Sequence, residues 1–259
     1  MKLHDRTFLV IGGTGGIGRA LVARLLSEGA HVIVTSRHQT NVTGLETVDV
    51  VTLDLETTEL ETQLGQISER FPQIDGVIYC AGQNRFASLE QTDTAMIDTQ
   101  LDTNLRAPML VARHFLPRLR NTKQSLMAFI GSTYGSIGFP GYAVYCASKF
   151  GLRGFTEALR REVADSNLSI LYVAPRATAT AMNPAAVEQM NKALGNQVDK
   201  PDEVASQILR AIHKNARMRF LGWPERLFVL INSVLPRIVD RALRKQLPVI
   251  RQFMRGGAI

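Results

Sequence analysis

Apolar residues along the chain gather in short, nearly continuous runs, separated by longer segments in which they recur every three or four positions. The runs are RTFLVIG (6–12), HVIVTS (31–36), VVTLDL (50–55), IDGVIYCAG (74–82), SLMAFIGS (125–132) and LSILYVAP (168–175). Runs of this kind are typical of strands covered on both faces of a sheet. The segments between them, among them 17–29, 58–71, 93–119 and 144–163, have the length and periodicity of amphipathic helices.

Alternating strands and helices predict an α/β fold with a parallel, doubly wound sheet, because right-handed crossovers place helices on both faces. We find no internal repeat, low-complexity linker or change of composition before about residue 215. The sequence therefore predicts one domain over residues 1–215, followed by an extension over 216–259 that differs in character.

Composition limits the class of protein. A chain of 259 residues with 45% hydrophobic residues can bury one large core. Its two cysteines, Cys80 and Cys146, cannot hold a metal cluster alone and suggest a reducing compartment. We see no signal peptide at the start and no run of about 18 apolar residues. We expect an intracellular, cytoplasmic protein, with attachment to a membrane surface left open, and no metal site.

Charge is unevenly distributed. The formal net charge is +7, from 30 basic and 23 acidic side chains. From Arg210 onward there are 11 lysines and arginines against only two acids, Glu225 and Asp240. The basic character therefore belongs to the C-terminal extension.

A glycine-rich stretch, IGGTGGIGRA (11–20), links the first predicted strand to the first predicted helix. Glycines at such a turn let the backbone approach a pyrophosphate, which the helix N-terminus then stabilises. A tight turn alone would also favour glycine. The position between a strand and an amphipathic helix favours a nucleotide cofactor.

Tyr145 and Lys149 stand four residues apart at the start of a predicted helix, so their side chains share a face. An ammonium near a phenol stabilises the phenolate and lowers the pKa of the tyrosine, which makes it a proton donor usable near neutral pH. The alternative is an ordinary exposed pair of residues.

The glycine spacing, Ser132 thirteen residues before Tyr145, the Tyr-x-x-x-Lys motif and Asn104 upstream together resemble the short-chain dehydrogenase/reductase family over about residues 5–213. The resemblance implies a single Rossmann-like domain that binds a nicotinamide cofactor. It also implies a catalytic set of Asn104, Ser132, Tyr145 and Lys149. In this set Tyr145 donates the proton, Lys149 also binds the nicotinamide ribose, Ser132 orients the substrate oxygen, and Asn104 holds a water between Lys149 and solvent.

The second strand indicates which nicotinamide cofactor is used. An acid that would bind the ribose hydroxyls of NAD is missing, since no carboxylate lies between Glu28 and Glu46. Ser36 and Arg37 occupy that place, and a guanidinium matches a 2′-phosphate. We therefore expect NADP(H), with Arg19 as a weaker second contact, although Arg37 could also belong to a solvated loop.

The cofactor-binding residues expected from the resemblance lie after successive strands. They are Gly12, Thr14, Gly15, Gly16, Ile17, Gly18, Ser36, Arg37, Asp54, Leu55, Ala81, Gly82, Asn104, Tyr145, Lys149, Pro175, Ala177 and Thr180.

Three features depart from the family pattern. Tyr79 and Cys80 stand where two asparagines are usual, and Arg176 stands where a glycine is usual. We expect Arg176 to alter the rim of the pocket or to bind an anionic group. The third departure is the extension, which replaces the usual glycine-rich end.

The extension carries Trp223 and apolar clusters among its basic residues. The clusters are Leu227, Phe228, Leu230, Ile231, Val234 and Leu235, then Ile238, Val239 and Leu243. Pro236 and Pro248 predict short separate helices. Basic amphipathic helices suit anionic membrane surfaces, but the same stripe could instead cover the substrate pocket as a lid. Nucleic-acid binding is disfavoured, because aromatic residues do not interleave with the basic ones.

Two classes of function follow. The first is an NADP(H)-dependent carbonyl reductase or alcohol dehydrogenase acting on a lipophilic small molecule, with Phe139, Tyr142, Met182, Met190 and Leu194 as an apolar lining. The second is a non-catalytic NADP(H)-binding sensor or scaffold of the same fold. The resemblance further implies a homodimer, or a higher homo-oligomer, through the helices around 93–119 and 143–165.

Overall fold

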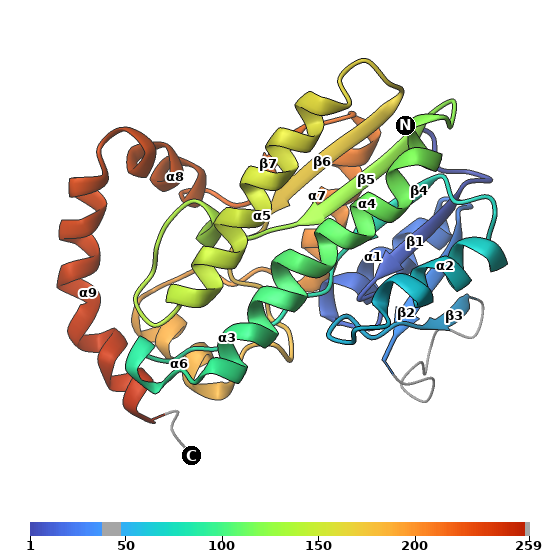
Figure 1. Cartoon of the computed structure of the whole chain (residues 1–259). Helices are drawn as coiled ribbons and strands as arrows, with labels where there is room; N and C mark the ends of the chain where they lie inside the picture. Colours follow the sequence, from blue (N-terminus) through green and yellow to red (C-terminus); the bar gives the residue numbers. More distant parts are fainter. Residues whose placement is uncertain (38–47, 257–259) are drawn as a thin grey trace.

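The computed structural model describes residues 1–37 and 48–256 and is built on a seven-stranded sheet (Figure 1). All neighbouring strands pair in parallel, in the order β3-β2-β1-β4-β5-β6-β7. The strands are β1 (Thr7–Ile11), β2 (His31–Ser36), β3 (Asp49–Thr52), β4 (Gly76–Tyr79), β5 (Ser125–Ile130), β6 (Leu168–Ala174) and β7 (Met218–Phe220). The predicted doubly wound α/β fold is confirmed. Each of the first six strands overlaps one of the six apolar runs, whereas β7 is too short to form a recognisable pattern.

Helices connect the strands and extend beyond the last one. They are α1 (Gly16–Ser27), α2 (Leu60–Arg70), α3 (Thr94–Leu101), α4 (Ala107–Arg120), α5 (Ala143–Glu162), α6 (Ala185–Ala193), α7 (Pro201–His213), α8 (Glu225–Val234) and α9 (Pro236–Gly256). The shorter turns are η2 (Leu89–Gln91), the π-helical η3 (Asp102–Arg106) and η4 (Thr133–Gly135). The single helix expected over 93–119 is thus divided by η3 into α3 and α4.

Alternate residues of each strand enter cores on opposite faces of the sheet. Leu9 and Ile11 face the core under α2, α4 and α5, while Phe8 and Val10 face the core under α1 and α7. Because both faces are covered, the strands are apolar at nearly every position. This explains why the strands are visible in the sequence.

The parallel topology brings the carboxyl ends of all strands to one edge. The chain order reverses between β1 and β4, which are neighbours in the sheet. In open α/β sheets such a switch point forms a crevice for a ligand. The glycine-rich turn follows β1, and Ala81 and Gly82 follow β4, so both line this crevice.

The two last helices stand at the far end of the sheet from β3 (Figure 1). They follow β7, which pairs with β6 and therefore belongs to the sheet although it lies beyond residue 215. Buried Ile250 of α9 joins a separate apolar cluster with Tyr142, Val187 and Met190. Within the described residues, no helix is long and apolar enough to span a membrane.

The two prolines of the extension behave differently. Pro236 begins α9, as predicted, but Pro248 lies inside that helix and does not end it. The prediction of a break at Pro248 is wrong. Its side chain is exposed, so the helix carbonyl that loses its donor to proline can be hydrated.

Candidate active site

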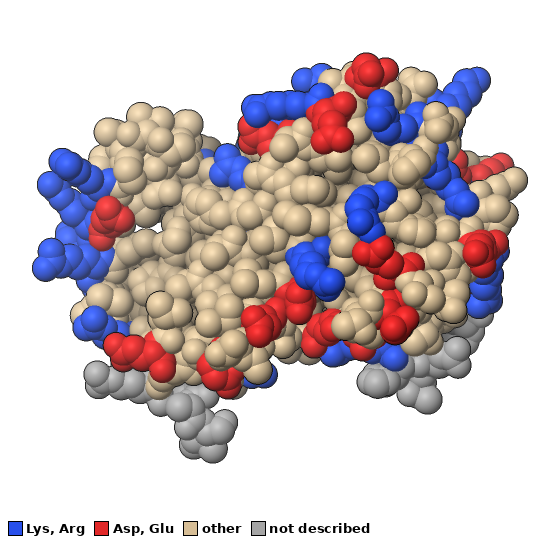
Figure 2. All heavy atoms as spheres, in the orientation of Figure 1, with Lys and Arg blue, Asp and Glu red and all other residues tan. Residues whose placement is uncertain are grey.

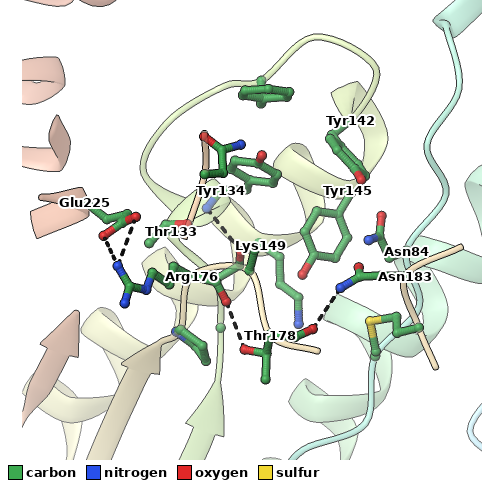
Figure 3. Close-up of a pocket in the computed structure, with 18 of the residues that line it drawn as sticks. Asn84, Thr133, Tyr134, Tyr142, Tyr145, Lys149, Arg176, Thr178, Asn183 and Glu225 are labelled. Carbon is green, nitrogen blue, oxygen red and sulfur yellow. Dashed lines mark hydrogen bonds and ion pairs between the residues drawn. The ribbon is translucent and has the colours of Figure 1, made fainter. Parts of the chain in front are cut away.

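Tyr145 and Lys149 lie on the same face of α5 and point into one pocket (Figure 3). The Lys149 ammonium is 5.7 Å from the centre of the Tyr145 ring and donates a hydrogen bond to the Ile130 carbonyl at 3.2 Å. Both side chains are buried. The four-residue spacing therefore produces the convergence that it predicts.

Burial controls the pKa values of this pair. It raises the pKa of Tyr145 to about 12, while a hydrogen bond from Ser132 acts in the opposite direction and nearby Cys146 adds to the rise. Burial lowers the pKa of Lys149 to about 8. The phenol pKa is therefore raised in the protein, contrary to the expectation that Lys149 would lower it, and desolvation of the buried phenol is the largest cause. At neutral pH Tyr145 carries its proton.

Ser132 follows β5 and is held by groups on two sides. Its hydroxyl accepts a hydrogen bond from the Tyr134 backbone N–H at 3.1 Å, and its own N–H donates to the buried Tyr172 hydroxyl at 3.4 Å. Gly131 makes room for that ring, since a Cβ there would lie 2.2 Å from the Tyr172 hydroxyl. Tyr172 is a supporting residue that the sequence reasoning missed.

Asn104 lies within η3 and is fully buried. Its Oδ1 accepts from the Gln83 N–H at 2.8 Å, and its Nδ2 donates to the Gln83 carbonyl at 2.8 Å and to Ser148 Oγ at 3.0 Å. Asn104 thereby ties the loop after β4 to α5. Helical segments with π geometry are frequent at functional sites.

Tyr79, one of the departures from the family pattern, supports the same segment. Its hydroxyl donates to the Thr103 carbonyl at 2.6 Å, next to Asn104. Cys80 lines the pocket, and burial raises the pKa of its thiol to about 12, although the charge of Lys149 acts against this. Tyr79 therefore braces the site by a different bond from the amides that it replaces.

The glycine-rich turn fits a dinucleotide. Gly12 has a positive φ of 79°, and a Cβ there would lie 2.6 Å from the Ala81 N–H nitrogen. A Cβ on Gly16 would lie 2.6 Å from Thr180 Cγ2. The N-terminus of α1 has no side-chain cap and no acid in its first turn. Its backbone N–H groups and helix dipole thus suit a phosphate group.

One cavity of about 440 Å³ joins this turn to Tyr145 and Lys149. The predicted residues that line it are Gly12, Gly15, Gly16, Ile17, Gly18, Ala81, Gly82, Ser132, Tyr145, Lys149, Pro175, Ala177 and Thr180. Thr14, Ser36, Arg37, Asp54, Leu55 and Asn104 are not among the lining residues. Ser36 is buried at the end of β2 and Arg37 is exposed beside it, whereas Asp54 and Leu55 are half-buried after β3.

Comparison with known proteins identifies the family. A family model described as short chain dehydrogenase matches residues 6–191. The chain belongs to the short-chain dehydrogenase/reductase family. It is therefore an oxidoreductase by family, with a fold that the family shares.

Three relatives of this dehydrogenase illustrate the range of the family. The 3-oxoacyl-(acyl-carrier-protein) reductase FabG of Haemophilus influenzae is 33% identical over 206 residues, covering 76% of this chain and 84% of the relative. The 3-ketodihydrosphingosine reductase of Bos taurus is 24% identical over 231 residues, covering 81% and 69%. A short chain dehydrogenase from Burkholderia cenocepacia J2315, solved in complex with NADP, has a TM-score of 0.83 at 21% identity, covering 94% and 99%.

The substrate side of this dehydrogenase pocket is aromatic and apolar. Of the five residues predicted to line it, Phe139, Tyr142 and Met182 do so, while Met190 and Leu194 pack in the cluster behind. The Tyr134 ring also lines the pocket and stacks on Phe139 with centroids 5.0 Å apart.

Asn84 is a polar lining residue that the sequence reasoning also missed. It hydrogen-bonds Tyr142, yet its Oδ1 is buried with no partner among the described residues. Figure 3 shows Asn84 and Asn183 on the side of the pocket opposite Arg176. A lone asparagine two residues after a glycine gives no signal in the sequence.

Arg176, the third departure, binds carboxylates of the protein itself. Its guanidinium pairs with Asp199 at 2.6 Å and with Glu225, the first residue of α8, at 3.2 Å (Figure 3). The anionic groups that Arg176 binds are therefore two carboxylates of this chain. The Arg176 ion pairs attach the extension to the loop after β6.

The extension forms one wall of the pocket through apolar side chains of α8 and α9. They are Phe228, Ile231, Ile238, Val239, Ala242 and Leu243. Gln246 of the same wall is polar. The extension therefore covers one side of the pocket, which is the position expected of a lid.

Proposed function

We propose that this protein transfers a hydride between NADP(H) and the carbonyl or secondary alcohol of a lipophilic small molecule. The observation that carries the proposal is the convergence of Ser132, Tyr145 and Lys149 on the cavity that also contains the glycine-rich turn. Family membership supports the reaction class.

The residues divide the work of reduction among them. The nicotinamide cofactor, when bound, supplies the hydride. Ser132 positions the substrate oxygen by a hydrogen bond, and Tyr145, protonated at neutral pH, donates the proton to that oxygen. The Lys149 ammonium stabilises the phenolate left behind and binds the ribose. Asn104 keeps the loop after β4 in register with α5.

NADP(H) is the proposed cofactor because of the end of β2. Arg37 is exposed immediately after Ser36, where a 2′-phosphate would lie beside the adenosine ribose. Asp54 and Leu55, after the neighbouring β3, would contact the adenine. The Burkholderia relative is described as an NADP complex, which is consistent with this choice.

A lipophilic substrate is supported by the pocket walls. Aromatic rings line one side and the apolar residues of α8 and α9 line the other. The two curated relatives described above are named as reductases of 3-oxoacyl and 3-ketodihydrosphingosine groups. We propose a ketone on an extended apolar chain, with residues 216–259 acting as the part of the enzyme that covers it.

We further propose a cytoplasmic homodimer. Two unpaired cysteine thiols suit a reducing compartment. Met109 of α4 and Phe150 of α5 are large apolar side chains exposed on the helical face predicted to bind a second copy.

The proposed reaction is tested by the loss of NADPH absorbance across a panel of carbonyl compounds of increasing chain length. We expect turnover by the parent protein and at least about a 100-fold lower rate for Tyr145→Phe, the typical contribution of a positioned acid. The dissociation constant for NADPH should change little. If Tyr145→Phe turns over normally, Tyr145 is not the proton donor. NADPH binding without turnover of any carbonyl or alcohol would favour the sensor or scaffold.

A further inference from the structure

The outward face of α8 is apolar. Leu227, Leu230 and Val234, at positions i, i+3 and i+7, lie on one side of the helix, opposite buried Val229. Trp223 is exposed just before the helix begins. An amphipathic helix normally turns such a stripe toward the protein core, so this exposed stripe needs another partner.

The outward face of α9 is basic. Arg237, Arg241, Arg244, Lys245 and Arg251 are all exposed, and none forms an ion pair with another residue that the structure describes. They follow one side of the helix over four turns. Figure 2 shows Lys and Arg side chains along the left edge of the molecule, where Figure 1 places α9, beside and below the uncharged lobe that contains α8.

Acidic residues do little to balance this basic stripe. Asp240 is the one acid of α9, and Glu225 at the start of α8 is already paired with Arg176. The basic surface of α9 thus lies beside the apolar surface of α8.

The proposed substrate pocket opens on the same surface. Phe228 and Ile238 line the cavity, yet they are 46% and 51% exposed. Phe228 of α8 and Ile238 of α9 are thus pocket-lining residues that also count among the exposed apolar side chains of this segment.

We propose that the outer surface of α8 and α9 docks on an anionic phospholipid bilayer. In this arrangement Trp223 and the apolar face of α8 enter the interface, and the basic stripe of α9 contacts the lipid phosphates. The pocket then faces the bilayer and takes its substrate from it. This last step rests on the proposed function, whereas the docking does not.

Other occupants fit the surface less well. A nucleic acid would match the basic stripe but leave the apolar face of α8 in water. A second copy bound symmetrically through this surface would bring two basic stripes together, and like charges repel. An anionic bilayer offers an apolar interior to the face of α8 and phosphate groups to the basic stripe of α9.

Vesicle flotation of the full chain tests the docking. We expect binding to phosphatidylcholine vesicles that contain phosphatidylserine, at least about tenfold stronger than to phosphatidylcholine alone at low salt. Binding should weaken as the salt concentration rises, because the charges are exposed and screened. Failure to bind the anionic vesicles at low salt, or equal binding to both kinds, overturns the proposal.

Matched variants locate the contact. Arg241→Glu with Arg244→Glu should lower anionic-vesicle binding by more than about tenfold, while Lys123→Glu with Lys214→Glu, at exposed sites outside the extension, should not. Leu230→Ser, at a side chain 60% exposed, should also weaken binding. Leu89→Ser, at a side chain 63% exposed in η2, should not. Equal effects of test and control variants would contradict the assigned surface.

Two further measurements separate this proposal from its alternatives. Turnover of a short, water-soluble carbonyl should be the same in the Arg241/Arg244 variant as in the parent, so vesicle binding can fail or succeed independently of the reaction. If Leu230→Ser instead turns a dimer into a monomer in sedimentation and leaves vesicle binding unchanged, the face is an interface between copies and the bilayer proposal is wrong.

Discussion

At the scale of single residues, the balance between burial and charge at Lys149 determines what the site can do. The side chain is only 4% exposed, and burial lowers its pKa to about 8. An ammonium with this pKa loses its charge within the range in which the protein can be assayed. The Tyr145 phenol, with a pKa of about 12, does not titrate in that range.

This difference predicts the alkaline side of the pH profile. Below pH 8 Lys149 is charged and can bind the cofactor ribose; above it the charge is lost, so kcat/KM for NADPH should fall by about tenfold per pH unit. The measurement is the initial rate of reduction between about pH 6 and 10 at constant ionic strength. Lys149→Arg, which stays charged, should flatten this limb. A parent profile that is level through pH 9 would contradict the assignment.

Arg37 gives the second prediction at this scale. Arg37→Ala should weaken NADPH binding by roughly 1–3 kcal/mol through loss of a charge-assisted bond, and NADH binding much less. Fluorescence titration of both cofactors measures the two constants. Arg19→Ala is the comparison variant, for which a smaller effect is expected. Equal affinity of the parent for NADPH and NADH would remove Arg37 from the cofactor site.

At the scale of elements, α8 is held at its first residue by the Arg176–Glu225 ion pair. Both side chains are largely buried, and Arg176 also pairs with Asp199, so removing the Glu225 charge breaks the attachment of α8 while Arg176 keeps its other partner. Glu225→Gln should loosen α8 and raise KM for a long-chain substrate several-fold, by about 1 kcal/mol of lost positioning, with NADPH affinity unchanged. Hydrogen exchange across α8 would report the loosening. Glu69→Gln, at an exposed site on α2, is the control.

Elements could be predicted from the sequence where they are determined by residues close together in the chain. Strands buried on both faces appear in the sequence as apolar runs. The glycine-rich turn and the four-residue spacing of Tyr145 and Lys149 likewise predict a local backbone geometry. The π-helical segment at Asn104 leaves no such trace, since it depends on Tyr79 and Ser148 from distant parts of the chain. The same holds for Tyr172 under Ser132 and for the wall that α8 and α9 add.

At the scale of the whole molecule, two exposed apolar side chains on one helical face bear on assembly. Phe150 lies on α5 and Met109 on the neighbouring α4, and both are exposed in a single chain. The double variant Phe150→Glu with Met109→Glu should therefore raise the dimer dissociation constant by more than about tenfold, because each introduced carboxylate would be buried in the interface without a partner. Sedimentation velocity over a range of concentrations measures it. A parent protein that remains monomeric throughout would contradict the proposed dimer.

The position of the pocket wall at the end of the chain has a consequence for biosynthesis. All seven strands and the glycine turn lie before residue 221, and α8 and α9 follow them. A ribosome makes the N-terminal part first, at about 5–20 residues per second, and folding proceeds in that order. The nucleotide-binding half can therefore assemble during translation before its outer wall exists. Cofactor loading is expected to precede closure of the nascent enzyme.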